Sequence, residues 1–166
     1  MNIDEIKYWA LRFRTGVETA HKNRLFKSQP FNDFPNACCG DAPELLAQYL
    51  IDNDLNQKIN CRIVYGTYRY DDFDNFFGHS WLVVNEGIIV DITADQRQFK
   101  NKNIFPQNAI QPCFVETNSE FHSMFEIVPV QCREFYGLRN FGDYAYKRMK
   151  ELYDIILSCI DENESY

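Results

Sequence analysis

The chain has 166 residues, of which 45% are hydrophobic and 16% aromatic, and this composition excludes an intrinsically disordered protein. Its formal net charge of -7 argues against nucleic acid or an anionic membrane as the main partner and favours a neutral or basic protein or peptide substrate. The N-terminus is polar and no apolar run has the length of a membrane span, so we expect a cytoplasmic protein, although signal-independent export would leave no mark.

A chain of this length can bury a core of its own, and we expect one domain over residues 1–166. The 6 cysteines are too few for a disulfide scaffold, and no two of them have the CxxC spacing that is typical of zinc sites. Most of the thiols are therefore expected to be small buried hydrophobes.

The spacing of apolar residues predicts two helices in the first third of the chain. The first covers residues 3–14, and an irregular stretch rich in Pro and Asn follows it. The second begins at Asp41, which forms a capping box with Glu44. Its apolar face has i, i+3, i+4, i+7, i+8 spacing and consists of Ala42, Leu45, Leu46, Tyr49 and Leu50.

β-Branched and aromatic residues predict strands in the middle of the chain. These strands cover residues 61–70, 79–84, 88–93 and 124–130. Residues 85–87 fit a hairpin turn, and the Asn- and Gln-rich residues 94–123 predict a long loop with room for one short strand. A last helix is expected over about residues 140–161, with an apolar stripe from 144 to 160, so the predicted fold class is α+β with helices packed on an antiparallel sheet.

His79 and Asp91 are polar residues in a hairpin that is otherwise apolar. A turn centred near Glu86 pairs residues whose numbers sum to about 172, which places 79 opposite 93 and 81 opposite 91. Both faces of residues 79–84 are apolar, so we expect this strand to be central. Asp91 then lies within a residue or two of His79, where a carboxylate orients an imidazole and stabilises its charged form.

Cys39 stands at or just before the start of the second predicted helix. There the positive end of the helix dipole and a protonated His79 would both lower the pKa of the thiol. Backbone N–H groups at that helix end could also stabilise an oxyanion. Cys39, His79 and Asp91 together make a nucleophile, a base and an orienting carboxylate, with the adjacent Cys38 as a competing thiol.

These residues occur in an order that resembles the transglutaminase-like branch of the papain-like cysteine enzymes. The resemblance covers roughly residues 36–95. The matching pieces read CGDAPELL at 39–46, RIVYG at 62–66, HSWLVV at 79–84, G at 87 and DIT at 91–93. Their combined order is far more specific than any one piece.

The resemblance implies a papain-like core in which Cys39 is the nucleophile, His79 the general base and acid, and Asp91 the orienting carboxylate. It favours Cys39 over Cys38, because only Cys39 has the family's spacing to Asp41. It implies an acyl-enzyme formed from an amide, peptide or isopeptide, without a cofactor, as in a protease, deamidase or transglutaminase-like acyltransferase. Small domains of this type are often effectors or toxins, an expectation that rests on analogy of fold alone.

The side chain that stabilises the oxyanion stays open between several amides. Papain-like enzymes often use an amide a few residues before the cysteine, where Asn32 and Asn36 are both available. Gln96 follows the hairpin closely and is a third candidate for the pocket. Trp81 is expected to support the pocket from within the hairpin.

Two other interpretations use the same residues. A zinc site could consist of Cys39, His79 and Asp91, with Cys38 or water as the fourth ligand. A catalytically silent papain-like fold could instead bind a protein through the acidic aromatic run at 70–78. Cys39 or His79 taken alone also fits a buried structural residue, but Asp91 does not, because an unpaired buried carboxylate costs on the order of several kcal/mol.

Overall fold

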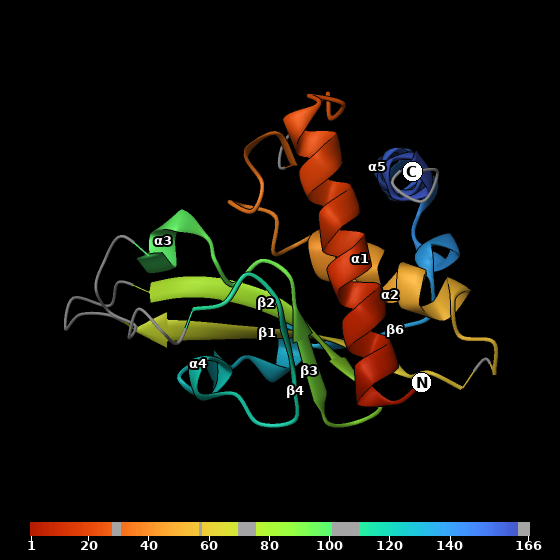
Figure 1. The fold of residues 1–166 in the computed structure, drawn as a ribbon. Coiled ribbons are helices and arrows are strands. Elements are labelled where there is room, and N and C mark those ends of the chain that lie inside the picture. Colours follow the sequence, from red (N-terminus) through yellow and green to blue (C-terminus); the bar gives the residue numbers. More distant parts are fainter. Residues whose placement is uncertain (28–30, 57, 70–75, 101–109, 163–166) are drawn as a thin grey trace.

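The structure is a computed structural model that describes residues 1–27, 31–56, 58–69, 76–100 and 110–162. It combines helices with an antiparallel sheet, which confirms the α+β class (Figure 1). Residues 70–75 of the acidic aromatic run and residues 101–109 of the predicted long loop lie outside the described residues. No helix in the described ranges is long and apolar enough to span a membrane.

The sheet has six strands in the order β4-β3-β2-β1-β5, and β6 also pairs with β1. The strands are β1 (Cys61–Arg69), β2 (Phe76–Val84), β3 (Ile88–Asp91), β4 (Phe114–Glu116), β5 (Glu126–Ile127) and β6 (Arg133–Phe135). β2 is therefore central, as predicted, although it begins before 79 and β3 ends before 93. The predicted hairpin register is confirmed, because Leu82 pairs with Val90 and Val84 with Ile88.

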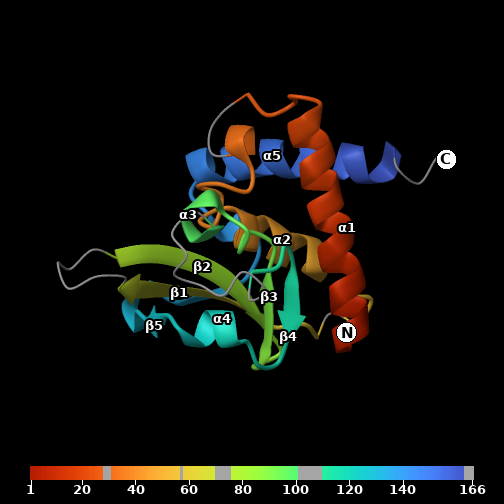
Figure 2. The same cartoon turned by 60° about the vertical axis from the view of Figure 1, so that its left-hand side comes forward.

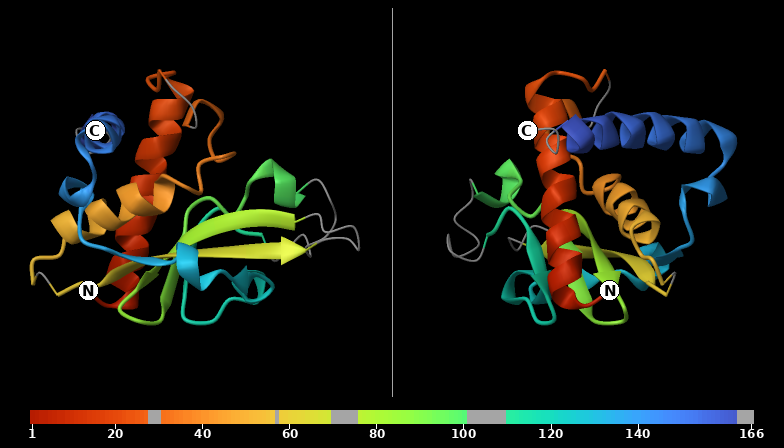
Figure 3. Two further views of the ribbon diagram at one scale, coloured as in Figure 1. Left: turned by 180° about the vertical axis from the view of Figure 1, so that it is seen from behind. Right: turned by 45° about the vertical axis from the view of Figure 1, so that its right-hand side comes forward.

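Three longer helices lie on one face of this sheet. They are α1 (Ile3–Lys22), α2 (Ala42–Asp52) and α5 (Asp143–Glu162), and α5 crosses α1 (Figures 2 and 3). The prediction that the first helix ends at 14 was too short, because Val17 and Ala20 continue its buried stripe. Just before Val17, Gly16 allows α5 to approach closely, since a Cβ at this position would lie 2.5 Å from Cγ1 of Ile160.

The predicted capping box at the start of α2 is wrong, although the helix does begin next to Asp41. The Asp41 side chain makes no capping hydrogen bond. Its two carboxylate oxygens instead accept hydrogen bonds from Arg148 of α5 at 2.6 and 2.8 Å. Glu44 pairs with Arg133 of β6. Charged partners from distant parts of the chain have thus replaced the local backbone partners.

Short helices that the sequence did not predict follow β3 along the chain, within residues 94–123. They are α3 (Arg97–Lys100) and α4 (Glu120–Ser123), and α4 lies across the sheet from α1, α2 and α5 (Figure 2). Residues 94–123 are therefore not a plain loop. The predicted strand at 124–130 is also wrong beyond β5, because Pro129 begins a 3-10 turn that ends at Gln131.

Each face of the sheet has its own apolar cluster. Aliphatic residues such as Ile63, Leu82 and Val90 belong to the large core that α1, α2 and α5 complete. The second cluster is mostly aromatic, and we call it the aromatic cluster. Its buried members are Val64, Trp81, Ala94, Phe99, Phe114, Phe121 and Phe125.

Candidate active site

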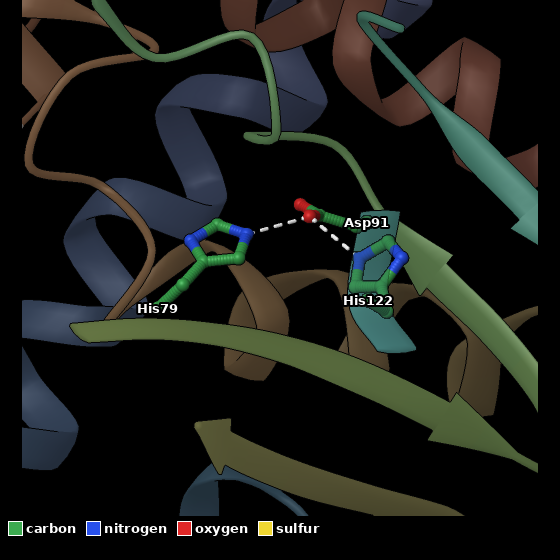
Figure 4. A group of neighbouring side chains, drawn as sticks. All are labelled: His79, Asp91 and His122. Atoms are coloured by element: carbon green, nitrogen blue, oxygen red, sulfur yellow. Dashed lines mark hydrogen bonds and ion pairs between the residues drawn. The ribbon is translucent and has the colours of Figure 1, made fainter. Parts of the chain in front are cut away.

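His79 and Asp91 meet across the hairpin, as the register predicts. Nε2 of His79 lies 2.6 Å from Oδ2 of Asp91 (Figure 4). His79 is 0% exposed and Asp91 is 2% exposed. Trp81, two residues along β2 from His79, shares its face of the sheet. The pair therefore sits on the face that carries the aromatic cluster.

The carboxylate of Asp91 accepts hydrogen bonds at both oxygens. Oδ1 accepts from the backbone N–H of Thr93 at 2.7 Å and from its hydroxyl at 3.1 Å. Oδ2 accepts from His79 and also from Nε2 of His122 at 3.1 Å. Burial alone would raise the pKa of Asp91, but the charge of His79 and these hydrogen bonds hold it far below its ordinary value. Asp91 is therefore an anion throughout the physiological pH range.

His122 is a member of this group that sequence reasoning missed. It lies on α4, is 3% exposed, and its Nδ1 is 2.7 Å from the hydroxyl oxygen of Ser119. It stands 31 positions from Asp91 in a polar segment without periodicity. No local pattern signals such a residue, because only the tertiary fold brings α4 to the end of β3.

Aromatic rings enclose the two histidines. The ring centroid of His79 lies 5.1 Å from that of Phe99 and 5.7 Å from that of Phe125. His122 is 5.0 Å from both Trp81 and Phe114, in edge-on contacts. Such apolar walls exclude water and strengthen each hydrogen bond inside them.

Cys39 is partly exposed and interacts with His79. Burial alone would raise the pKa of its thiol. The hydrogen bond and the positive charge of His79, with hydrogen bonds from the Ser80 backbone and the Gln96 side chain, lower it instead. Conversely, burial lowers the pKa of His79, but Asp91 and Cys39 together raise it to about 9. A thiolate beside an imidazolium is therefore the favoured form of the pair.

The neighbouring Cys38 has the opposite environment. It is 0% exposed, and its S–H donates to the backbone oxygen of Asn36 at 3.2 Å. Burial, followed by the negative charges of Cys39 and Asp41, raises the pKa of the Cys38 thiol. Of the two adjacent thiols, Cys39 alone faces the histidine.

The four residues predicted to line the pocket differ in how close they lie to Cys39 and His79. Nε2 of Gln96 lies 3.2 Å from Nδ1 of His79, so this amide faces both the imidazole and the thiol. Asn36 is next to the site, where its Oδ1 accepts from the backbone N–H of Arg97 at 2.7 Å. The Trp81 ring contacts both histidines, with ring centroids 6.0 Å from His79 and 5.0 Å from His122. Asn32 is exposed and lines a different hollow, together with His21 and Lys22.

Arg14 of α1 fixes the turn that carries Gln96. Its guanidinium donates to both carboxylate oxygens of Asp95 at 2.9 and 3.0 Å and to the backbone oxygen of Ile92 at 2.6 Å. Arg14 is 7% exposed and Asp95 is 8% exposed. A bidentate pair of this kind is directional as well as strong, so it holds the turn in one orientation.

The set with the spacing of cation ligands, among the described residues, is His79, Asp91 and His122, whose ligand atoms all lie within 4.8 Å of one another. The predicted zinc set with Cys39 and Cys38 is therefore not the one that the structure assembles. Both imidazoles approach one oxygen at hydrogen-bond distances, and the remaining oxygen of Asp91 and nitrogen of His122 have partners of their own. This geometry fits a hydrogen-bond network around the anionic carboxylate of Asp91.

No protein-family model, curated protein or solved structure matches this chain. Conclusions about its function rest on the chemistry of the site.

Proposed function

We propose that the chain is a cysteine enzyme with a papain-like, transglutaminase-like core that acts on an amide, peptide or isopeptide carbonyl. The observation that carries the proposal is a partly exposed thiol of lowered pKa beside an imidazole whose other side is held by a buried carboxylate. A structural cysteine needs no such partners, as Cys38 illustrates. The order of helix-start thiol, strand histidine and strand aspartate further supports this class.

The proposed reaction has two steps. The sulfur of Cys39 attacks the carbonyl carbon and forms an S–C bond, and the C–N bond breaks as His79 gives its proton to the leaving nitrogen. Water or an amine then attacks the acyl carbon and passes a proton to His79, and the S–C bond breaks to restore the thiolate. Asp91 takes no proton, because its role is to orient the imidazolium and stabilise its charge.

Two donors already surround the sulfur and would serve the oxyanion. The Ser80 backbone and the Gln96 amide both hydrogen-bond to Cys39. A carbonyl oxygen that develops negative charge next to the sulfur would lie near the same donors, where preorganised N–H groups stabilise it. Arg14 and Asp95 keep Gln96 in that place.

Alkylation by iodoacetamide, mapped by mass spectrometry from pH 5.5 to 9.5, tests the proposal. We expect Cys39 to react ahead of the five other cysteines, with a midpoint below the ordinary thiol value of about 8.5. In His79→Gln the thiolate loses its charged partner, so this midpoint rises and the rate at pH 7 falls on the order of tenfold.

Cys38→Ser is the matched control and should leave the alkylation of Cys39 unchanged. Cys113 is an internal reference in every sample, because burial raises the pKa of its thiol to about 12. Equal labelling of all six thiols would contradict the enzyme and favour a silent binding fold. Faster labelling of Cys38 would move the nucleophile to that residue.

A further inference from the structure

Two imidazoles share one carboxylate oxygen in the interior of this protein. His79 and His122 both direct Nε2 at Oδ2 of Asp91, at 2.6 and 3.1 Å, and the two rings lie on either side of the carboxylate (Figure 4). The reaction proposed above uses His79 and leaves His122 without a task. All three side chains are nearly or fully buried.

The hydrogen bonds determine where the protons lie. Asp91 is an anion and only accepts, so His122 donates through Nε2–H. The hydroxyl oxygen of Ser119 accepts the backbone N–H of His122 at 3.4 Å and lies 2.7 Å from Nδ1 of the same residue. His122 is therefore held between two polar partners, with Nε2 facing Asp91 and Nδ1 facing Ser119.

We propose that His122 is a positioning residue that holds Oδ2 of Asp91 and shares its negative charge with His79, which limits the basicity of His79. A donor on the same oxygen draws charge toward itself, and its positive end also faces the neighbouring imidazolium. Both effects weaken the attraction between Asp91 and His79. In the apolar surroundings of the aromatic cluster they are larger than they would be in water.

The other neighbours of the pair are two cysteines and a set of uncharged rings. Cys39 faces His79 from the segment before α2, and its thiolate raises the pKa of His79. Cys113, just before β4, senses the charge of Asp91 but stays protonated. The side chains that pack on His79 from β2, α3 and α4 are Trp81, Phe99 and Phe121, which carry no charge. Apart from the Cys39 thiolate, Asp91 and His122 therefore decide how tightly His79 holds its proton.

This inference rests on the proposed function, in which His79 must release its proton to a leaving nitrogen. A general acid works best when its pKa is near the operating pH, and a pKa of about 9 is already high for that task. An Asp91 that interacted with His79 alone would raise it further. His122 thus favours proton release while Asp91 still orients the imidazole.

Histidine NMR titration tests the inference without any need for enzyme activity. The chain has only 3 histidines, so ring-labelled protein gives three assignable signals, of which His21 is an internal reference. The titrations are done on Cys39→Ala protein, which removes the thiolate from the measurement. His122→Phe keeps a ring of similar shape but removes the donor, and we expect the pKa of His79 to rise by about half a pH unit or more.

Two further variants separate charge sharing from packing. His122→Gln places an amide N–H near the position of Nε2, so the pKa of His79 should stay within about 0.2 of the Cys39→Ala value. Phe114→Leu changes the packing against His122 without removing a donor to Asp91, and should also leave it unchanged. His122→Leu repeats the loss of the donor with a smaller side chain in case His122→Phe does not fold.

An unchanged or lowered pKa of His79 in His122→Phe and His122→Leu would overturn the inference, since a purely structural role would loosen the Asp91 contact. That result would not contradict the proposed function, because the proposed reaction depends on Cys39 and His79 and not on His122. If Cys39 were alkylated no faster than the other cysteines, the proposed function would be wrong. The effect of His122 on the pKa of His79 could still be measured by the titration.

Discussion

The two faces of the sheet bury their residues by different rules. On the face toward α1, α2 and α5, aliphatic side chains such as Leu82 and Val90 fill space and need no specific partner. On the other face, His79 and Asp91 are buried just as completely, but among the described residues each buried side-chain nitrogen and oxygen there has a hydrogen-bond partner. On the first face, stability depends on how completely the side chains fill the core. On the second face, it depends on complete hydrogen bonding.

This contrast also explains where reactivity arises. Aliphatic side chains that only pack against one another have no titratable group that could take part in a reaction. The aromatic cluster surrounds a small set of charges with apolar rings, so each interaction there is strong enough to shift pKa values. The comparison can be tested by substitutions that are matched between the faces.

The largest effect is expected from Asp91→Asn. The amide has one acceptor oxygen where the carboxylate has two, so at least one buried N–H or O–H group loses its partner and His79 loses its counter-charge. We expect the free energy of unfolding to fall by about 3–5 kcal/mol in urea denaturation. The reactivity of Cys39 at pH 7 should fall with it.

Asp154→Asn on α5 is the matched control for this change. Asp154 is an exposed partner of Lys150 one helical turn away, and exposed pairs at this spacing contribute about 0.3–0.5 kcal/mol. If Asp91→Asn cost no more than Asp154→Asn, the contrast between the two faces would be wrong.

The sequence predicted the parts of the molecule that local patterns determine. The apolar stripe of α2 and the register of the β2–β3 hairpin follow from spacing over a few residues, and so does the contact of His79 with Asp91. Local rules failed where distant residues compete. Arg148 takes Asp41 away from its capping box, and His122 reaches Asp91 only through the tertiary fold.

The end of the first helix was predicted too early, and the residues beyond it depend on a distant partner. Gly16 has the character of a helix breaker in a single sequence, yet it lies inside α1 because the absence of a side chain lets α5 approach. The partner that explains such a residue, Ile160, is far away in the sequence. The same kind of close contact occurs on the opposite face at Gly66.

Gly66→Ala and Gly16→Ala test the two faces with one chemical change. A Cβ at 66 would lie 2.8 Å from Cβ of Phe125 and 3.0 Å from the ring of Trp81, and a Cβ at 16 would be equally crowded by Ile160. We expect each variant to lose about 1–3 kcal/mol of unfolding free energy through overpacking.

The reactivity of Cys39 distinguishes the two glycine variants. Gly66 is the strand partner of His79 in β1, so a shift of the aromatic cluster displaces the imidazole. The alkylation of Cys39 should slow in Gly66→Ala and stay normal in Gly16→Ala when both are measured below their melting temperatures. Equal effects on alkylation would mean that the two cores are not independent.

The smallest effect is expected from Ser119→Ala, which leaves Nδ1 of the buried His122 without its hydrogen-bond partner. It also removes the side chain that caps α4. Together these losses should lower the free energy of unfolding by about 1–2 kcal/mol. Ser158→Ala on α5 removes a hydroxyl that also donates a hydrogen bond, to the backbone oxygen of Ile155, but at an exposed position, so its effect should stay within about 0.5 kcal/mol. Two equal values would show that burial in the aromatic cluster adds nothing to a hydroxyl hydrogen bond. A clear difference would show that complete hydrogen bonding stabilises this face at Ser119 as well as at Asp91.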